Sequence, residues 1–278
     1  MINLKKDERL KRYIEGKGKN GVVIAFSGGV DSATLAAVCH NVLGEKAVAV
    51  TAKSPTYTSE EMEGAIKIAK EIAIEHYFVE TDTLSNENFA KNPENRCYYC
   101  KTELLECLQK FAHEKGLGVI FEGTNFSDLG GHRPGFKAVK ERENVFSPWM
   151  ENEFTKDEIR AMAKKLGLSI YDKPASSCLA SRIPFGECIT EERLQRVAEA
   201  ERIIKSTSNV RQLRVRDHNG LARVEVGRDE MALLFDDAIT DKIVEKLKQL
   251  GFNFITLDLE GYRTGSMLIK TEIENESK

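Results

Sequence analysis

Val22-Val23-Ile24-Ala25-Phe26 runs directly into Ser27-Gly28-Gly29-Val30-Asp31-Ser32, which is followed by the helix-like run Ala33-Thr34-Leu35-Ala36-Ala37-Val38. The first five residues form the continuous β-branched and aromatic run that is typical of a buried parallel strand. Glycines without a Cβ let the backbone turn sharply and approach a bound anion. The N–H groups of such a turn and the positive end of the following helix both attract phosphate. The stretch therefore predicts a strand, an anion-binding turn and a helix.

The side chains of this turn suit a nucleotide. Ser27 and Ser32 can donate hydroxyls to phosphate oxygens, and Asp31 can hold Mg²⁺. The spacing fits neither a Walker A loop nor the dinucleotide fingerprint. An ordinary glycine-rich turn is the alternative, but the complete hexapeptide argues against it. The hexapeptide resembles the PP-loop of the ATP pyrophosphatases, which cleave ATP between the α and β phosphates and adenylate a substrate. The resemblance implies that Ser27, Gly28, Gly29, Asp31 and Ser32 bind ATP with Mg²⁺, and that Asp31 is catalytic.

Length and composition indicate a globular protein of two domains. The chain has 278 residues, of which 41% are hydrophobic and 31% charged. No apolar stretch reaches the roughly 20 residues that span a bilayer, and Met1 to Glu8 lack a signal-peptide core. We therefore expect a cytoplasmic protein without a membrane segment. The net charge of −3 argues against a nucleic-acid partner.

Strands and helices alternate along the first 170 residues. Strands are expected at 22–26, 47–51, 76–80, 119–122 and 145–148, with helices at 7–15, 33–43, 58–74, 97–113, 136–142 and 155–167. This alternation predicts an α/β fold with a doubly wound parallel sheet, whose ligands lie beyond the carboxyl ends of the strands.

Polar residues follow two of these strands. Thr51 and Ser54 come after the second strand, where they can contact adenine and ribose or simply form a turn. Gly123, Thr124, Asn125 and Asp128 follow the fourth strand in a long loop. Long loops within a compact domain are usually functional, so we favour nucleotide binding there.

The pattern changes after about Cys178. A helix is expected at 191–206, then a hairpin of 212–216 and 222–226 across Asn219-Gly220, a helix at 229–250 and a strand at 254–259. This order predicts a smaller α+β domain for substrate binding and oligomerisation. We place the boundary at Ser176, giving domains 1–176 and 177–278; the last residues, Thr271 to Lys278, are expected to fray.

Three cysteines form a second group. Cys97 and Cys100 make a Cys-x-x-Cys motif at the start of a helix, and Cys178 lies just before the second domain. Zinc would need a fourth ligand, which is not obvious. Three thiolates suit a [4Fe-4S] cluster with one open iron; a zinc site, a redox dithiol and unrelated cysteines are the alternatives. The other three are expected to be a buried residue, a helix-face residue and a loop thiol, namely Cys39, Cys107 and Cys188.

The PP-loop, the segment 123–128 with Arg133-Pro134-Gly135, and the segment 174–184 together resemble the LarE family of ATP-dependent sulfur transferases. The resemblance implies adenylation of a carboxylate of pyridinium-3,5-biscarboxylic acid mononucleotide and its conversion to a thiocarboxylate, for the nickel-pincer cofactor of lactate racemase. One branch of that family sacrifices a cysteine at the position of Cys178. The other holds a [4Fe-4S] cluster on three cysteines, which implies Cys97, Cys100 and Cys178 here and sulfide on the open iron. The family also forms homo-oligomers.

Arginines gather in the expected hairpin. Arg214 and Arg216 alternate onto one face, and planar guanidinium groups suit a phosphate or a carboxylate of the mononucleotide. A solvated strand face paired to Glu225 is the alternative. Arg182 lies four residues after Cys178, so we expect it to act at the sulfur site as a catalytic and substrate-binding residue. Glu201 can face the same pocket or simply face solvent.

Three other functions fit part of the sequence. A tRNA thiolase of the PP-loop class would also use a three-cysteine cluster, but the acidic balance argues against it. An amide-forming ATP pyrophosphatase, such as an NAD or GMP synthetase, has no need of the three cysteines. A nucleotide-sensing binding module would keep the turn without releasing pyrophosphate.

Overall fold

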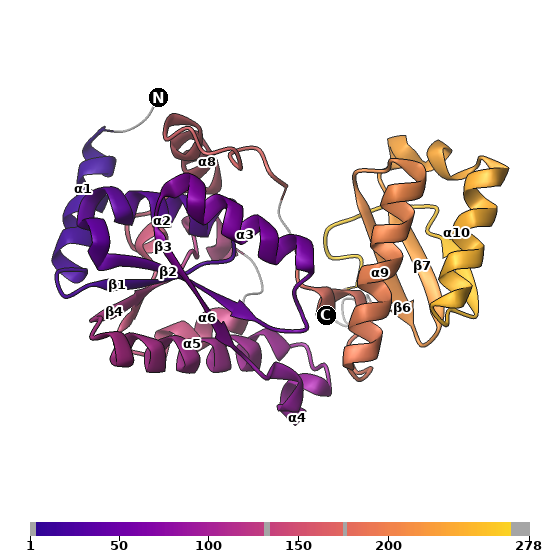
Figure 1. Cartoon of the computed structure of the whole chain (residues 1–278), viewed down its shortest axis with the longest axis horizontal. Helices are drawn as coiled ribbons and strands as arrows, with labels where there is room; N and C mark the ends of the chain where they lie inside the picture. Colours follow the sequence, from indigo (N-terminus) through magenta and orange to yellow (C-terminus); the bar gives the residue numbers. More distant parts are fainter. Residues whose placement is uncertain (1–3, 131–133, 175–176, 268–278) are drawn as a thin grey trace, which may run out of the picture. The chain divides into compact units, whose positions relative to one another are not determined.

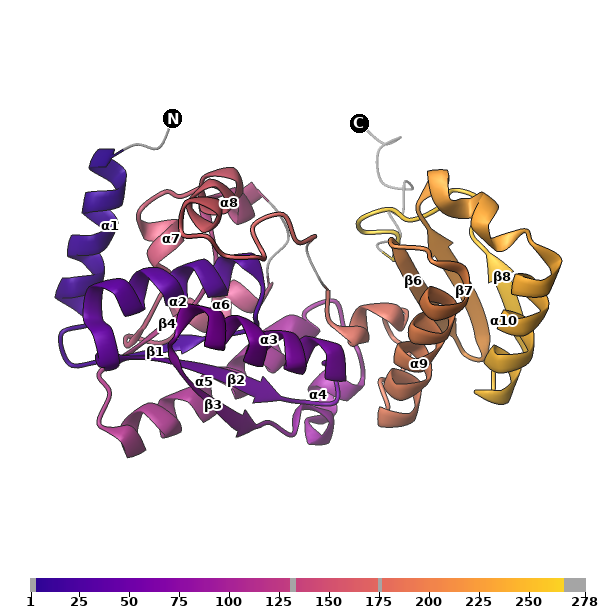
Figure 2. The same ribbon diagram turned by 45° about the horizontal axis from the view of Figure 1, so that its top comes forward.

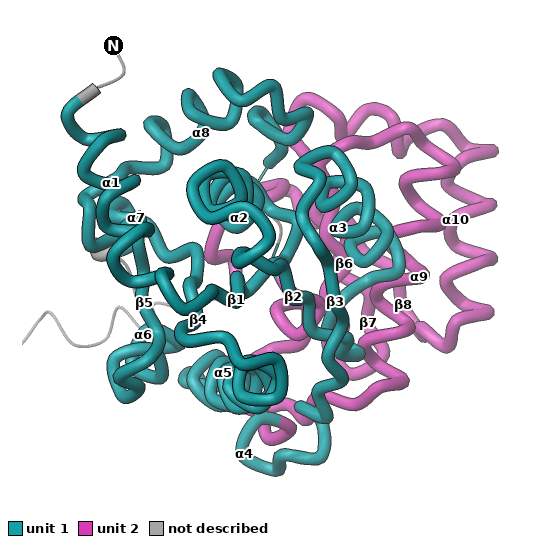
Figure 3. Tube along the Cα trace, turned by 60° about the vertical axis from the view of Figure 1, so that its left-hand side comes forward, with its two compact units in different colours: residues 1–89, 94–177 teal, residues 90–93, 178–278 magenta. Residues whose placement is uncertain are grey.

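The computed structural model describes residues 4–130, 134–174 and 177–267 and shows two compact units. Unit 1 comprises Met1–Phe89 and Glu94–Ser177, and unit 2 comprises Ala90–Pro93 and Cys178–Lys278 (Figure 3). The expected boundary residue, Ser176, and the expected frayed tail lie outside the described residues. The four residues from Ala90 to Pro93 group with unit 2, which the sequence pattern did not indicate.

Unit 1 is built on a five-stranded parallel sheet. The strands follow the order β3-β2-β1-β4-β5, and every pair is parallel. They are β1 (Val22–Ala25), β2 (Ala47–Lys53), β3 (Glu75–Glu80), β4 (Val119–Phe121) and β5 (Val145–Phe146). The predicted doubly wound α/β fold is confirmed. The chain reverses direction across the sheet between β1 and β4, so the carboxyl end of β1 lies at the position where such sheets bind ligands.

Helices cover both faces of this sheet (Figures 1 and 2). One face carries α1 (Leu4–Lys17), α2 (Val30–Leu43), α3 (Ser59–Ile72), the short α7 (Pro148–Glu151) and α8 (Lys156–Lys165). The other face carries α5 (Arg96–Lys115) and α6 (Pro134–Lys140), and a further short helix is α4 (Glu87–Ala90). Because successive strand residues point to opposite faces, Val22 and Ile24 pack with the first group and Val23 packs with the second.

Two helices begin with the capping box that the sequence predicts. Glu61 N donates to Thr58 Oγ1 over 3.2 Å, and Thr58 N donates to the Glu61 carboxylate over 2.9 Å. Thr155 and Glu158 repeat the arrangement at the start of α8. Each box satisfies backbone N–H groups that the first helical turn leaves without partners, and so fixes where the helix starts.

Unit 2 is a three-stranded sheet with two long helices. β6 (Leu213–His218) and β7 (Leu221–Val226) are antiparallel across Asn219-Gly220, and β8 (Phe254–Leu257) runs parallel to β7. The helices are α9 (Glu191–Ser208) and α10 (Asp237–Gln249). The predicted hairpin and the smaller α+β unit are confirmed.

The expected helix at 229–250 was wrong in its first third. Residues Arg228–Leu234 form a 3-10 turn, and α10 begins only after Asp236. The Asp236 carboxylate accepts a hydrogen bond from Ile239 N at 3.1 Å. An aspartate in this position caps a new helix, so the chain breaks there. Throughout the part of the chain that the structure describes, no helix has both the length and the apolar character needed to cross a membrane.

Candidate active site

The turn between β1 and α2 closes on itself. Ser32 Oγ accepts a hydrogen bond from Ser27 N at 3.1 Å and donates to the Gly29 carbonyl at 3.2 Å. Gly28 has a φ of +67°, and a Cβ there would come within 2.8 Å of the Ala65 Cα in α3. Only glycine fits this position without strain. The five predicted phosphate-binding residues therefore share one tight turn at the N-terminus of α2, and we call residues 27–32 the clasp.

Asp31 leaves one carboxylate oxygen open. Its Oδ2 pairs with Lys156 Nζ at 2.5 Å, and its backbone carbonyl accepts from Trp149 Nε1 at 3.0 Å. Its Oδ1 is buried and has no hydrogen-bond partner within the described parts of the chain. Burial raises the pKa of Asp31, against the opposing effect of Lys156. A buried carboxylate oxygen without a partner is a hard ligand of the kind that Mg²⁺ prefers, so the clasp fits that ion.

The loop after β4 meets the clasp at Gly123. A Cβ on Gly123 would lie 3.2 Å from Ser32 N and 3.3 Å from Asp31 Cβ, so the missing side chain permits this close approach. Asn125 is buried, and its N–H donates to Asp128 Oδ2 at 3.2 Å. Thr124 turns back to the preceding Glu122, to which its hydroxyl donates at 2.8 Å. Of the four residues predicted here, Gly123 thus adjoins the clasp, while the other three shape the loop.

The two residues predicted after β2 differ in their surroundings. Thr51 is buried; its hydroxyl donates to the Phe26 carbonyl at 2.7 Å and lies 2.8 Å from His76 Nε2. It therefore holds the end of β1, immediately before the clasp. Ser54 Oγ accepts from Thr56 N at 3.3 Å, which is the turn-forming alternative for this residue.

Glu122 is a residue of this site that the sequence reasoning missed. Its side chain is 3% exposed and accepts hydrogen bonds from Lys101 Nζ at 3.0 Å and from the Ser147 hydroxyl. Burial alone would raise the pKa of Glu122, but Lys101 and the hydroxyls of Ser147 and Thr124 outweigh it and hold that pKa below its ordinary value. The only signal in the sequence was an acid directly after an apolar strand.

Cys97 and Cys100 lie in the first turn of α5. Cys97 is exposed and Cys100 is half-buried. The start of α6 packs against this turn, because a Cβ on Gly135 would lie 3.2 Å from the Cys97 carbonyl. Both cysteines belong to unit 1, whereas Cys178 belongs to unit 2. Over residues 4–130, 134–174 and 177–267, no group of three or more Cys, His, Asp or Glu side chains is arranged to hold a metal ion.

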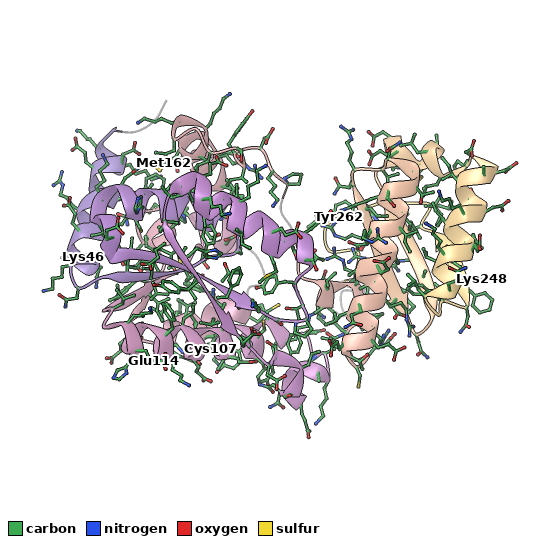
Figure 4. The ribbon with its side chains drawn as sticks, viewed as in Figure 1. Lys46, Cys107, Glu114, Met162, Lys248 and Tyr262 are labelled. Carbon is green, nitrogen blue, oxygen red and sulfur yellow. The ribbon has the colours of Figure 1, made fainter. Side chains whose placement is uncertain are left out.

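The other cysteines have the surroundings that the sequence predicts. Cys39 is fully buried in the α2 core, where desolvation raises its pKa. Cys107 lies on α5 (Figure 4), with its Sγ 3.6 Å from the Glu80 carbonyl. Cys188 is exposed.

Arg182 and Glu201 form a buried pair within unit 2. Arg182 donates to both oxygens of Glu201, over 2.8 and 3.0 Å, and Glu201 also accepts from Val215 N at 3.0 Å. Glu201 is therefore buried, and the alternative that it faces solvent is wrong. Arg182 Nη1 also donates to the Cys178 carbonyl at 3.2 Å. The pair thus fixes the backbone at the candidate sulfur-bearing residue.

Two further arginines join this cluster from β6. Arg216 donates to Glu225 at 2.7 Å and to the Ser181 carbonyl at 2.9 Å. Arg214 stacks over the ring of Tyr262 at 5.3 Å (Figure 4 labels Tyr262). Burial, with the nearby Arg182 charge, lowers the pKa of Arg214. The Nε atoms of Arg214 and Arg216 are buried without a hydrogen-bond partner in the described structure.

The four predicted substrate-binding residues, Arg182, Glu201, Arg214 and Arg216, therefore come together in unit 2. Their three guanidinium groups lie near two carboxylates, those of Glu201 and Glu225. Buried cations with open donors are suited to an anionic ligand such as a phosphate or carboxylate.

Comparisons with known proteins agree with this site. The NAD synthase family model matches residues 3–98, which include the clasp. An uncharacterized protein of Synechocystis is 44% identical over 88% of this chain and 91% of its own length. The pyridinium-3,5-bisthiocarboxylic acid mononucleotide synthase of Lactiplantibacillus plantarum is 34% identical over 88% of each chain.

This chain belongs to the LarE family. It is therefore an ATP-using enzyme of the PP-loop type. More distant similarity extends to one of the subunits of the glutamine-hydrolyzing GMP synthase of Pyrococcus abyssi, which is 26% identical over 96% of this chain and 91% of its own length. Membership of the LarE family agrees with the resemblance that the clasp and the segments around 123–135 and 174–184 indicate.

Proposed function

We propose that this LarE-family chain adenylates a carboxylate of pyridinium-3,5-biscarboxylic acid mononucleotide and exchanges one oxygen for sulfur, giving a thiocarboxylate for nickel-pincer cofactor synthesis. The observation that carries the proposal is the clasp, in which Gly28 and Gly123 open the turn and one Asp31 oxygen has no partner among the described residues. The relative of Lactiplantibacillus plantarum, named for the bisthiocarboxylic acid product, supplies the substrate class.

Adenylation is the first half of the proposed reaction. A carboxylate is a poor acyl donor because its charge is delocalised, and joining it to AMP creates a good leaving group. The substrate carboxylate oxygen attacks the α phosphorus, the bond from that phosphorus to the bridging oxygen breaks, and pyrophosphate leaves with the electron pair. The N–H groups of the clasp and the hydroxyls of Ser27 and Ser32 face charge that builds up on pyrophosphate. Asp31 would hold Mg²⁺, which neutralises the same charge.

Sulfur transfer is the second half. Cys97, Cys100 and Cys178 would hold a [4Fe-4S] cluster through three thiolates, and its open iron would supply sulfide. The donor set fits the group, since Cys97 and Cys100 share one helical turn with accessible sulfur atoms. The alternative source is the Cys178 thiol itself. With either source the sulfur forms a bond to the acyl carbon, and AMP leaves with the electrons of the broken carbon–oxygen bond.

Unit 2 would bind the mononucleotide. Arg214 and Arg216 present buried cations whose Nε atoms have no partner within the described ranges, which suits its phosphate or ring carboxylates. Arg182 acts beside them through its hydrogen bond to the Cys178 carbonyl. We also propose that unit 2 mediates homo-oligomer formation and that the enzyme is cytoplasmic, without a nucleic-acid partner.

Anaerobic iron and acid-labile sulfide analysis with an optical spectrum tests the sulfur source. We expect a brown protein with about four iron and four sulfide per chain. A colourless, iron-free protein that transfers sulfur once, with mass loss at Cys178, would move the source to that thiol. A colourless, iron-free protein that forms an amide would contradict the proposal and favour the GMP synthase-like alternative, to which the similarity with the Pyrococcus protein points.

Cys178→Ala separates the two halves of the reaction. We expect pyrophosphate release to continue at close to the wild-type rate while sulfur transfer stops, because the clasp lies in unit 1 and the thiol in unit 2. Cys188→Ala is the matched control, since it removes an exposed thiol from the same unit. Equal loss of both half-reactions in a folded Cys178→Ala protein would contradict this division.

A further inference from the structure

Lys156 holds the carboxylate that the proposed function assigns to Mg²⁺. Its Nζ lies 2.5 Å from Asp31 Oδ2, and both side chains remain more than a quarter exposed, at 28% and 27%. The neighbouring oxygen, Asp31 Oδ1, is buried with no hydrogen-bond partner in the part of the chain that is described. An ammonium and a metal ion therefore compete for one aspartate at the clasp.

The base of Lys156 is fixed by its surroundings. Lys156 is the first residue of α8, directly after the Thr155 cap, and its N–H donates to Ser127 Oγ at 3.1 Å. The first turn of a helix is an unfavourable place for a cation, because the positive end of the helix dipole lies there. That helix end and the ammonium together form a concentrated positive region, which favours an anion beside Asp31.

We propose that Lys156 is a pyrophosphate-binding residue that leaves Asp31 when Mg²⁺ arrives with ATP and pairs instead with the β or γ phosphate. The proposal rests on the proposed ATP chemistry. Without nucleotide, Lys156 neutralises a half-buried carboxylate that would be costly to leave alone. With MgATP, the metal replaces it at Asp31, and the ammonium neutralises charge on the departing pyrophosphate as the bond from the α phosphorus breaks. No proton moves in this exchange.

Lys156→Met tests the exchange through two measurements. Binding of Mn²⁺ without nucleotide, followed by electron paramagnetic resonance of the free ion, should tighten by about fivefold because the competing ammonium is gone. Substrate-dependent pyrophosphate release should fall by roughly 10- to 100-fold in kcat/KM for ATP. Lys156→Arg keeps the cation and should leave Mn²⁺ binding near wild type. Lys164→Met, which removes an exposed lysine from the same helix, should change neither measurement.

Unchanged or weaker Mn²⁺ binding in Lys156→Met, or unchanged kcat/KM for ATP, would overturn the proposal and reduce the contact to a surface ion pair. The Mn²⁺ measurement requires no turnover, so it can be read even if wild-type protein releases no pyrophosphate. That last result would defeat the proposed function instead. Thermal melts confirm that each variant is folded before either measurement is interpreted.

Discussion

Glu122 carries its charge inside unit 1 because three groups from different elements donate to it. Lys101 comes from α5, Ser147 from the end of β5, and Thr124 from the loop that follows β4. The carboxylate thereby connects the helix that begins with Cys97 and Cys100 to the loop that meets the clasp. Buried ion pairs are weak sources of net stability, but losing one partner leaves an uncompensated charge.

Glu122→Gln should lower the free energy of unfolding by about 3 kcal/mol, because Lys101 then lacks a counter-charge. Lys101→Met should cost a similar amount by exposing the opposite charge. The double variant should cost clearly less than the two single costs together, since neither charge then remains. Additive costs in denaturant titrations would contradict the pairing.

Acid should weaken unit 1 in two stages. Burial lowers the pKa of His76 below its ordinary value of 6.5, so this residue favours folding above that pH and its contribution declines as the pH falls towards the lowered value. The pKa of Glu122 is held below its ordinary 4.5, so its contribution is complete above pH 4.5 and disappears at lower pH. His76→Asn should remove the upper stage from urea unfolding measured between pH 4 and 8. An identical pH profile in that variant would contradict this assignment.

At the scale of elements, the clasp depends on the close packing of α3 against the turn after β1. Gly28 has a positive φ and faces the Ala65 backbone. Gly44, at the end of α2, has a φ of +57°, and a Cβ added to it would meet no described atom within 4 Å. The two glycines therefore separate backbone strain from steric exclusion.

Gly28→Ala should abolish ATP binding, because the turn must move away from α3 to admit the methyl group. Gly44→Ala should cost only about 1 kcal/mol of unfolding free energy from its backbone conformation and should leave ATP binding unchanged. Isothermal titration with MgATP checks both variants. Wild-type affinity in Gly28→Ala would show that the turn does not need this geometry.

The local elements of the site could be predicted and the long-range ones could not. The hexapeptide from Ser27 to Ser32 identified the clasp because strand, turn and helix are adjacent in sequence. The contact between Asp31 and Lys156 joins residues 125 positions apart, and no local pattern marks it. Likewise, Glu201 looked like a surface residue of an amphipathic helix, since its partner Arg182 lies in a different element.

At the scale of the whole molecule, the second unit is completed by four residues from far earlier in the chain. Asn92 is fully buried, with a φ of +56°, and its Nδ2 donates to the Pro184 carbonyl at 2.6 Å. Gly186 N donates back to the Asn92 carbonyl at 2.9 Å, and Ile189 N donates to the Ala90 carbonyl at 2.8 Å. A boundary drawn at one position in the sequence cannot include such a segment, because it depends on non-local contacts.

Asn92→Ala should lower the stability of unit 2 by about 2 kcal/mol, because buried carbonyl groups lose their donor and alanine tolerates the left-handed backbone less well than asparagine. Asn88→Ala is the control, since that side chain is exposed. Denaturant unfolding followed by hydrogen exchange in β6 and β7 reports on unit 2. Equal effects of the two variants would contradict the assignment of residues 90–93 to that unit.

The central claim is that this LarE-family enzyme cleaves ATP between the α and β phosphates to activate a carboxylate of the mononucleotide. Phosphorus NMR of ATP incubated with the enzyme, Mg²⁺ and pyridinium-3,5-biscarboxylic acid mononucleotide measures this directly. We predict AMP and pyrophosphate, formed only when the mononucleotide is present. ADP and inorganic phosphate as the products would contradict the account.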